Sequence, residues 1–368
     1  MPEKARNYTI DTLRIVLCLM VFCIHMPEEF PENIRPYLVG LARIAVPMFF
    51  MISGYFIYDE TPDVVVTRIK KQLKRLIPLL IFMLILYYSW FFLHQYSLFG
   101  KIRQSDIQSV FGTQALLSFF VYNRPINSAD LLWYLPAYIY VLLIYLAFIK
   151  IRTEEYRIKS SNSGLIIMTI ILMTVFILVS EITTFNNYKD FFLMFRRNFL
   201  FFGLPFFTVG YVIKSYMRKT NKQKKLAWIF GILTIISLGL LFAEMHLRSM
   251  FVNAQDMAIK ELYIMCIPLA IFLFLFCIYT PNIGKISKIY LIGSKYTLYI
   301  YCYHVIIKDL LLECEVYHYL FISVLLSSFF VAFLHYHIAK AISKKFPKLW
   351  ISTMESLTFK KNNVIIIK

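Results

Sequence analysis

The sequence lacks the cysteine patterns that would support a disulfide-linked or metal-binding domain. Its six cysteines all lie in or beside apolar runs, and no two of them have the Cys-x-x-Cys spacing of a metal site or a redox motif. We therefore expect them to be small buried apolar residues and expect no metal. Long hydrophilic stretches are lacking too, so any chemistry must happen inside an apolar bundle or at its two mouths.

Acidic residues are scarce. The 368 residues include 21 Asp and Glu against 39 Lys and Arg, which gives a formal net charge of +18. Such an excess can indicate a nucleic-acid partner. Here the basic residues gather in short segments between apolar runs, so no nucleic acid is expected, and the membrane itself is the expected environment.

Apolar residues dominate what is present. They make up 59% of the chain, and the mean hydropathy is +0.64. Several runs exceed the roughly 18 apolar residues that cross a bilayer as a helix. The first run is followed by "HMPEEF" and no small-residue cleavage site, so we expect it to be retained. The sequence predicts an all-α, polytopic membrane helix bundle of about ten transmembrane helices. The predicted spans are 10–26, 37–58, 76–96, 131–149, 165–182, 198–213, 226–244, 261–280, 289–307 and 316–339.

The distribution of basic residues predicts the orientation of the bundle. With the N-terminus inside, 27 of the 39 Lys and Arg fall on the inner side. Cytoplasmic segments carry such an excess. We therefore expect both termini to be cytoplasmic, with a transmembrane domain over 1–345 and a basic tail over 346–368. The expected location is a bacterial cytoplasmic (inner) membrane.

The first span, "DTLRIVLCLMVFCIH", contains charges that are costly in lipid. Arg14 and His25 are eleven residues apart, which is about 20° from three full helical turns and roughly 16 Å along the axis. Asp11 precedes Arg14 by three residues and can pair with it. This stripe predicts a functional track. The alternatives are a helix-end pair that reaches the headgroups for Asp11 and Arg14, and an interfacial residue for His25.

Two further segments add cations at opposite ends of the bundle. Arg43 lies in the second span, where Pro47 frees a backbone carbonyl and can bend the helix. The inner segment "RIKKQLKRLIPLL" contains Lys71, Lys74 and Arg75, which are expected to share a helix face able to hold phosphates. The positive-inside rule alone would also place cations there.

Aromatic residues and a histidine mark the ninth span, "GSKYTLYIYCYHVIIKDLL". Tyr299 and Tyr303 are four residues apart and predict an aromatic face, with His304 beside it. Such a face suits a cavity or a sugar platform, and simple packing is the alternative. Trp133 opens the fourth span, where an interfacial aromatic residue is expected.

These segments together resemble the acyltransferase-3 family of integral membrane acyltransferases. The resemblance rests on the Arg14 and His25 spacing, on "VPMFFMISGYF", on "KRLIPL" with Arg75 and on "GSKYTLYIYCYH". The arginine motif of the family usually has two arginines three residues apart, whereas here Gln72 stands three residues before Arg75. Lys71 and Lys74 supply charge nearby but not a planar fork.

The resemblance implies transfer of an acyl group, often acetyl, from cytoplasmic acyl-coenzyme A to an extracytoplasmic or lipid-linked glycan of the cell envelope. Acyl-coenzyme A would be a co-substrate, with Arg14, Arg75, Lys71 and Lys74 at its phosphates. Its pantetheine arm would follow the Arg14–His25 stripe. His25 would be the general base, or would carry the acyl group transiently. Asp11, Arg43, Trp133, Tyr299, Tyr303 and His304 would orient the substrates.

Two other functions fit the same pattern of residues. Buried charges and proline-bent helices also suit a membrane transporter or flippase of a small polar solute or a lipid-linked glycan. A structural subunit of an envelope assembly is the third reading, and it predicts that Arg14 and His25 tolerate substitution.

Overall fold

The computed structural model describes residues 6–125, 127–151, 161–185, 197–217, 222–252, 257, 260–286 and 288–345. These residues form helices and connecting turns and contain no strand. Eight of the helical segments in this part of the chain are long and apolar enough to cross a membrane. The prediction of an all-helical, multi-pass membrane protein is thereby confirmed, while the expected tail over 346–368 lies outside the described residues.

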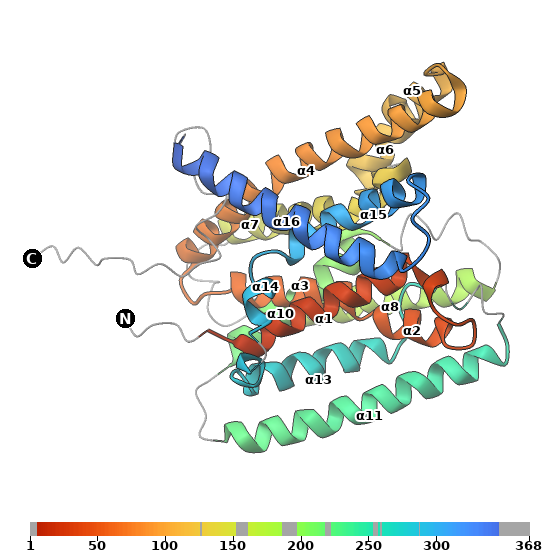
Figure 1. Ribbon diagram of the computed structural model, residues 1–368. Coiled ribbons are helices and arrows are strands. Elements are labelled where there is room, and N and C mark those ends of the chain that lie inside the picture. Colours follow the sequence, from red (N-terminus) through yellow and green to blue (C-terminus); the bar gives the residue numbers. More distant parts are fainter. Residues whose placement is uncertain are drawn as a thin grey trace, which may run out of the picture.

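Figure 1 shows the helices gathered in one bundle, with α11 along one side and α4 and α16 along the opposite side. The elements are α1 (Tyr8–His25), η1 (Pro27–Glu29), α2 (Arg35–Ala42), α3 (Ala45–Ile57), α4 (Pro62–Phe99), α5 (Gln104–Phe111), α6 (Thr113–Tyr122), η2 (Asn127–Trp133), α7 (Tyr134–Ile151), α8 (Ser161–Phe185), η4 (Phe199–Gly203), α10 (Leu204–Tyr216), α11 (Gln223–Ser249), α13 (Cys266–Tyr279), η5 (Ile283–Lys285), α14 (Tyr290–Gly293), α15 (Thr297–Glu313) and α16 (Leu320–Lys345).

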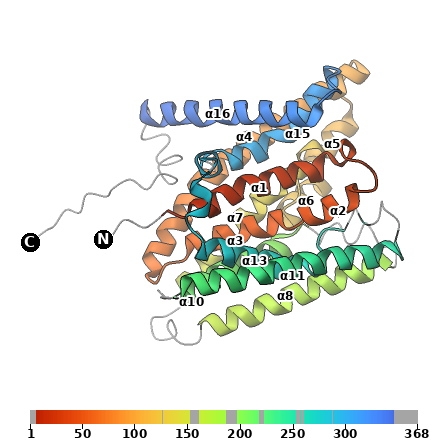
Figure 2. The same ribbon diagram turned by 60° about the horizontal axis from the view of Figure 1, so that its bottom comes forward.

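Helix α1 lies inside the bundle, where it packs against α2, α3, α14 and α15 (Figures 1 and 2). The side chain of Asn7 caps its first turn by accepting a hydrogen bond from the Ile10 amide at 3.0 Å. Gly293 at the end of α14 approaches the helix so closely that an added Cβ would lie 1.7 Å from the Asp11 carbonyl oxygen. The charged stripe of α1 is therefore surrounded by protein.

The second predicted span is broken into α2 and α3 at Arg43 and Ile44. Pro47 has no amide hydrogen to donate to the Arg43 carbonyl, so the helix loses a hydrogen bond at this point. The predicted bend is therefore present. It leaves the Arg43 side chain between two helix ends.

Two predicted spans have different bounds in the structure. The third is the 38-residue helix α4, which begins at Pro62, so the basic cluster of Arg68 to Arg75 lies on the helix itself. The ninth is divided into the four-residue α14 and the 17-residue α15, with a turn over residues 294–296. Neither α15 nor the 14-residue α13 is among the eight segments long and apolar enough to span.

Helices α3 and α10 pack closely against each other through a glycine on each helix. A Cβ added to Gly54 would lie 2.0 Å from the Phe207 carbonyl oxygen, and one added to Gly210 would lie 1.9 Å from that of Met51. Small residues let two backbones approach in this way. This contact fixes α3, and with it the break at Arg43, against the core.

Candidate active site

His25, the last residue of α1, faces His304 of α15. Their ring centroids are 5.1 Å apart and the rings are tilted by 60°. Phe22, one turn earlier on α1, stacks on His304 with centroids 4.9 Å apart. His25 is half-buried, while only 1% of His304 is exposed. Helix packing thus brings together two imidazoles from opposite ends of the sequence.

The hydrogen bonding of His304 fixes its neutral form. Its Nδ1 lies 2.7 Å from the Tyr301 carbonyl oxygen, which can only accept, so Nδ1 carries the hydrogen and donates it. In a neutral ring Nε2 then keeps its lone pair, and this buried atom has no hydrogen-bond partner among the residues that the structure describes. His304 therefore offers a free proton acceptor beside His25.

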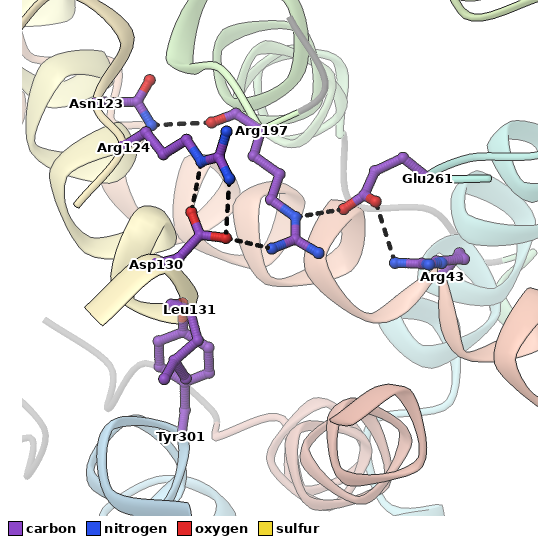
Figure 3. A network of polar contacts seen from close by, with 8 residues as sticks. All are labelled: Arg43, Asn123, Arg124, Asp130, Leu131, Arg197, Glu261 and Tyr301. Carbon is purple, nitrogen blue, oxygen red and sulfur yellow. Dashed lines mark hydrogen bonds and ion pairs between the residues drawn. The ribbon is translucent and has the colours of Figure 1, made fainter. Parts of the chain in front are cut away.

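Figure 3 shows a chain of ion pairs, two of whose arginines, Arg43 and Arg197, are close enough to His25 to act on it electrostatically. Glu261 bridges two arginines, at 3.2 Å from Arg43 Nη1 and 2.8 Å from Arg197 Nε. Arg197 Nη1 also lies 3.4 Å from Asp130 Oδ2, and Asp130 Oδ1 accepts a hydrogen bond from Arg124 Nε at 2.7 Å. Arg43 and Glu261 are buried, so each charge is stabilised mainly by its partner.

Arg197 is the centre of this chain. Burial alone would lower the pKa of Arg197, but Glu261 and Asp130 outweigh this effect and hold its pKa above the usual value. The guanidinium stays charged. Arg197, Arg43 and Lys308 all lie close enough to His25 to act on it electrostatically, so positive charge surrounds the imidazole.

Backbone contacts hold the ion-pair chain in place. The Asn123 amide donates to the Arg197 carbonyl oxygen at 2.9 Å, and its oxygen accepts from the Phe199 amide at 2.8 Å. On the opposite side the Tyr301 hydroxyl donates to the Leu131 carbonyl oxygen (Figure 3). The Asn123 bonds tie the start of η4 to the end of α6, and the Tyr301 bond ties α15 to η2, which carries Asp130.

The other end of the α1 stripe carries Arg14. It pairs with Asp11 at 2.9 Å, as the sequence predicts, and Asp11 also pairs with Arg6 at 2.8 Å. Arg6 in turn donates to the Ser294 hydroxyl at 2.8 Å. The Arg14 side chain is 18% exposed and its guanidinium lies 5.2 Å from the centroid of Phe56, so it points into the bundle.

Arg75 of α4 approaches the same region from another helix. Its side chain is buried, and its guanidinium lies 5.6 Å from the centroid of Tyr299. Its Nε has no hydrogen-bond partner in the described part of the chain. It is close enough to Arg14 for the two cations to repel each other. Among the described residues, Arg6 and Arg14 share the Asp11 carboxylate and Arg75 forms no ion pair, so this end favours the binding of an anion.

The remaining predicted residues have different surroundings. Lys71 is half-buried, one turn before Arg75, whereas Lys74 is exposed. Tyr299 and Tyr303 face His335 of α16, with a ring distance of 4.7 Å for the first and a hydrogen bond of 2.7 Å for the second. His304 therefore belongs to a different face of α15 from these tyrosines. Trp133 is buried, packed edge-on against Phe202.

Arg43 is a candidate from its place in the second predicted span, but the sequence does not predict its partners. Arg124, Asp130, Arg197 and Glu261 stand at or beside the ends of predicted spans, where charged residues are usually solvated. Their pairing depends on which span ends meet. A signal for Glu261 is the short run "KEL" directly before an apolar segment, which alone does not distinguish it from a surface turn.

Comparison with known proteins identifies the chain. The model of the acyltransferase-3 family, described as an acyltransferase domain, matches residues 7–337. A serine/alanine racemase of Enterococcus gallinarum is 26% identical over 265 residues, which are 68% of this chain and 35% of that protein. An amino-acid racemase of Enterococcus faecalis is 23% identical over 324 residues, 82% of this chain and 41% of that protein. The chain thus spans less than half the length of either relative. No solved structure matches it.

Proposed function

Since the chain belongs to the acyltransferase-3 family, we propose that it is a membrane O-acyltransferase whose donor is cytoplasmic acetyl-coenzyme A or another acyl-coenzyme A. The proposed acceptor is a hydroxyl of an extracytoplasmic or lipid-linked glycan of the cell envelope. The proposal includes ten helices, cytoplasmic termini and a bacterial inner membrane. The observation that carries it is that Arg14 and His25 both point into the bundle, each among further charged or imidazole groups.

Support for donor binding comes from the inner end of the stripe. Arg14 and Arg75 converge from α1 and α4, and Lys71 lies one turn from Arg75. Guanidiniums bind phosphate oxygens through short charge-assisted hydrogen bonds. Asp11 and Arg6 hold Arg14 in position. The coenzyme A phosphates would bind here, and the extended pantetheine arm would carry the thioester about 16 Å along α1 to His25.

Support for the chemistry comes from the outer end. His25 takes the proton of the acceptor hydroxyl while that oxygen attacks the thioester carbonyl. The tetrahedral intermediate then expels the coenzyme A thiolate, which recovers the proton from the imidazolium, leaving an ester and a free thiol. An acyl group carried transiently on His25 is the alternative route. The cations around His25 would stabilise the oxyanion.

His304 is proposed as a positioning residue. Its Nε2 lone pair can accept a hydrogen bond from His25 or from the acceptor hydroxyl, and the Tyr301 carbonyl keeps the ring in that tautomer. An imidazole that is held in one tautomer by a neighbour is a recurring feature of acid–base sites. The residue thus acts through the group that it orients.

The second candidate function is a transporter or flippase. It is favoured by the two relatives, whose names state that they act on amino acids, small polar solutes that a membrane domain could carry. One experiment separates the two functions. Purified protein is mixed with labelled acetyl-coenzyme A, with and without a glycan acceptor. A transferase releases coenzyme A in an acceptor-dependent way and labels the glycan. A transporter binds solute and releases none.

A further inference from the structure

Lys308 of α15 is a cation beside the proposed base, and among the described residues no carboxylate forms an ion pair with it. It follows His304 by one helical turn and donates from Nζ to the His25 carbonyl oxygen at 3.0 Å. An ammonium has three donors, and the structure gives this one a single acceptor within the described part of the chain. The side chain is half-buried, so its charge is only partly solvated.

The neighbouring carboxylates do not complete this site. Asp309 is close enough to act electrostatically on Lys308, yet the two form no ion pair. Glu313 pairs with His94 at 3.0 Å instead. Glu28 and Glu29, just beyond His25, are exposed and make no ion pair with Lys308.

Among the described residues, the cations near His25 and the ion-pair chain that joins two of them carry more positive than negative charge. Arg43, Arg124 and Arg197 share two carboxylates, those of Glu261 and Asp130. With Lys308 added there are four cations and two carboxylates, and counting Asp309 as a third still leaves one positive charge in excess. Partly buried charge of one sign is costly unless an opposite charge compensates it.

We propose that the acceptor carries an anionic group, a carboxylate or a phosphate, which Lys308 binds next to His25. This inference rests on the proposed transferase function and names its acceptor class. Lys308 is anchored to the backbone of the base itself, so an anion bound there lies beside the reacting hydroxyl. A single acidic sugar residue carries both the reacting hydroxyl and the anionic group, whereas a neutral sugar leaves the Lys308 ammonium without an opposite charge.

The test compares three acceptors that differ in charge: methyl glucuronide, glucose 6-phosphate and neutral methyl glucoside. Full-length protein in phosphatidylcholine nanodiscs is assayed for kcat/KM of coenzyme A release. We expect at least one anionic acceptor to be favoured about tenfold or more over the neutral one, because a hydrogen bond to a charged group is worth roughly that factor. The preference should decline with salt. Equal rates for all three in the wild type would overturn the inference without any variant.

Variants test whether Lys308 causes the preference for anionic acceptors. Lys308→Met keeps the aliphatic stem and should bring the ratio to within about twofold, because the anionic acceptors lose more of their kcat/KM than the neutral one. Lys308→Arg should preserve the preference, and Lys225→Met, an exposed lysine of α11, should leave it unchanged. A preference that survives Lys308→Met in protein of wild-type thermal stability contradicts the inference.

Two further measurements complete the test. The first distinguishes an anion of the acceptor from a lipid headgroup, and the second distinguishes the anion site from the transferase function. If phosphatidylglycerol in the nanodiscs activates the wild type and abolishes any acceptor preference, a lipid headgroup is the ligand and the acceptor inference is wrong. Thermal shift measures acceptor binding without turnover. A Lys308-dependent preference for methyl glucuronide in binding, with no coenzyme A release, supports the anion site while contradicting the proposed transferase.

Discussion

The imidazoles of His25 and His304 face each other, with 5.1 Å between their ring centroids. Of the two rings, His304 is the one whose hydrogen bond to a backbone carbonyl defines its tautomer. His304 donates from Nδ1 to the Tyr301 carbonyl and presents a free Nε2. We infer that His304 is held in one orientation by this bond, while His25, at the end of α1, is the proposed group that exchanges a proton.

Two substitutions at His304 separate a positioning role from a packing role. His304→Gln places an amide near the Nε2 position, whereas His304→Asn places one near Nδ1, where it can still bond the Tyr301 carbonyl. We expect the Gln variant to keep transfer within about tenfold and the Asn variant to lose about a hundredfold, within the range for acid–base groups. Acceptor-dependent coenzyme A release measures this, and the reverse order would show that His304 only supports the fold.

Arg75 is expected to bind the donor. Arg75→Met should raise KM for acetyl-coenzyme A about tenfold and change kcat little, because a lost phosphate contact weakens the ground state and the transition state equally. Lys70→Met removes an exposed cation from the same helix and serves as the control. Equal effects of both variants on KM would indicate a general surface charge effect and no defined donor site.

Gly210 is expected to be essential for the contact between α3 and α10. Gly210→Ala forces a Cβ against the Met51 carbonyl oxygen, 1.9 Å away, so the helices must separate. We expect a loss of about 2 kcal/mol or more in unfolding free energy. Gly239→Ala in α11, where an added Cβ meets nothing within 4 Å, is the matched control and should change stability by about 1 kcal/mol or less. Thermal unfolding in detergent compares the two, and similar midpoints would contradict the close packing.

Glu261 is expected to matter for stability because it bridges two arginines. Glu261→Gln leaves Arg43 buried without its carboxylate, which should cost about 3–5 kcal/mol. Arg197 retains Asp130. The double variant Arg43→Met with Glu261→Gln should therefore be more stable than Glu261→Gln alone. If the two losses simply add in chemical denaturation, the ion pair makes no coupled contribution.

Local features of the sequence predicted much of this arrangement. The three-residue spacing of Asp11 and Arg14 is a property of one helix, and their 2.9 Å ion pair follows from it. Pro47 predicted the break at Arg43 for a similar reason, since a missing amide acts on the residue four positions earlier. Such relationships need no knowledge of how helices pack.

Long-range pairings could not be predicted in the same way. Glu261 and Arg197 stand at the ends of different spans, and their bond depends on which ends meet. The neighbours of α15 are a similar case. The sequence predicts an aromatic face with His304 beside it, but not that Tyr303 contacts α16 and His304 contacts α1. Lys74 and Arg75 are neighbours in sequence, yet the bundle buries only the second.

The central claim is that His25 carries out acyl transfer at the outer end of the stripe. The most direct measurement is acceptor-dependent release of coenzyme A from labelled acetyl-coenzyme A by His25→Ala, with the exposed His318→Ala as the control. We predict a loss of at least a hundredfold for His25→Ala at an unchanged amount of protein in the membrane, and full activity for His318→Ala. Transfer by His25→Ala at the wild-type rate would contradict the account.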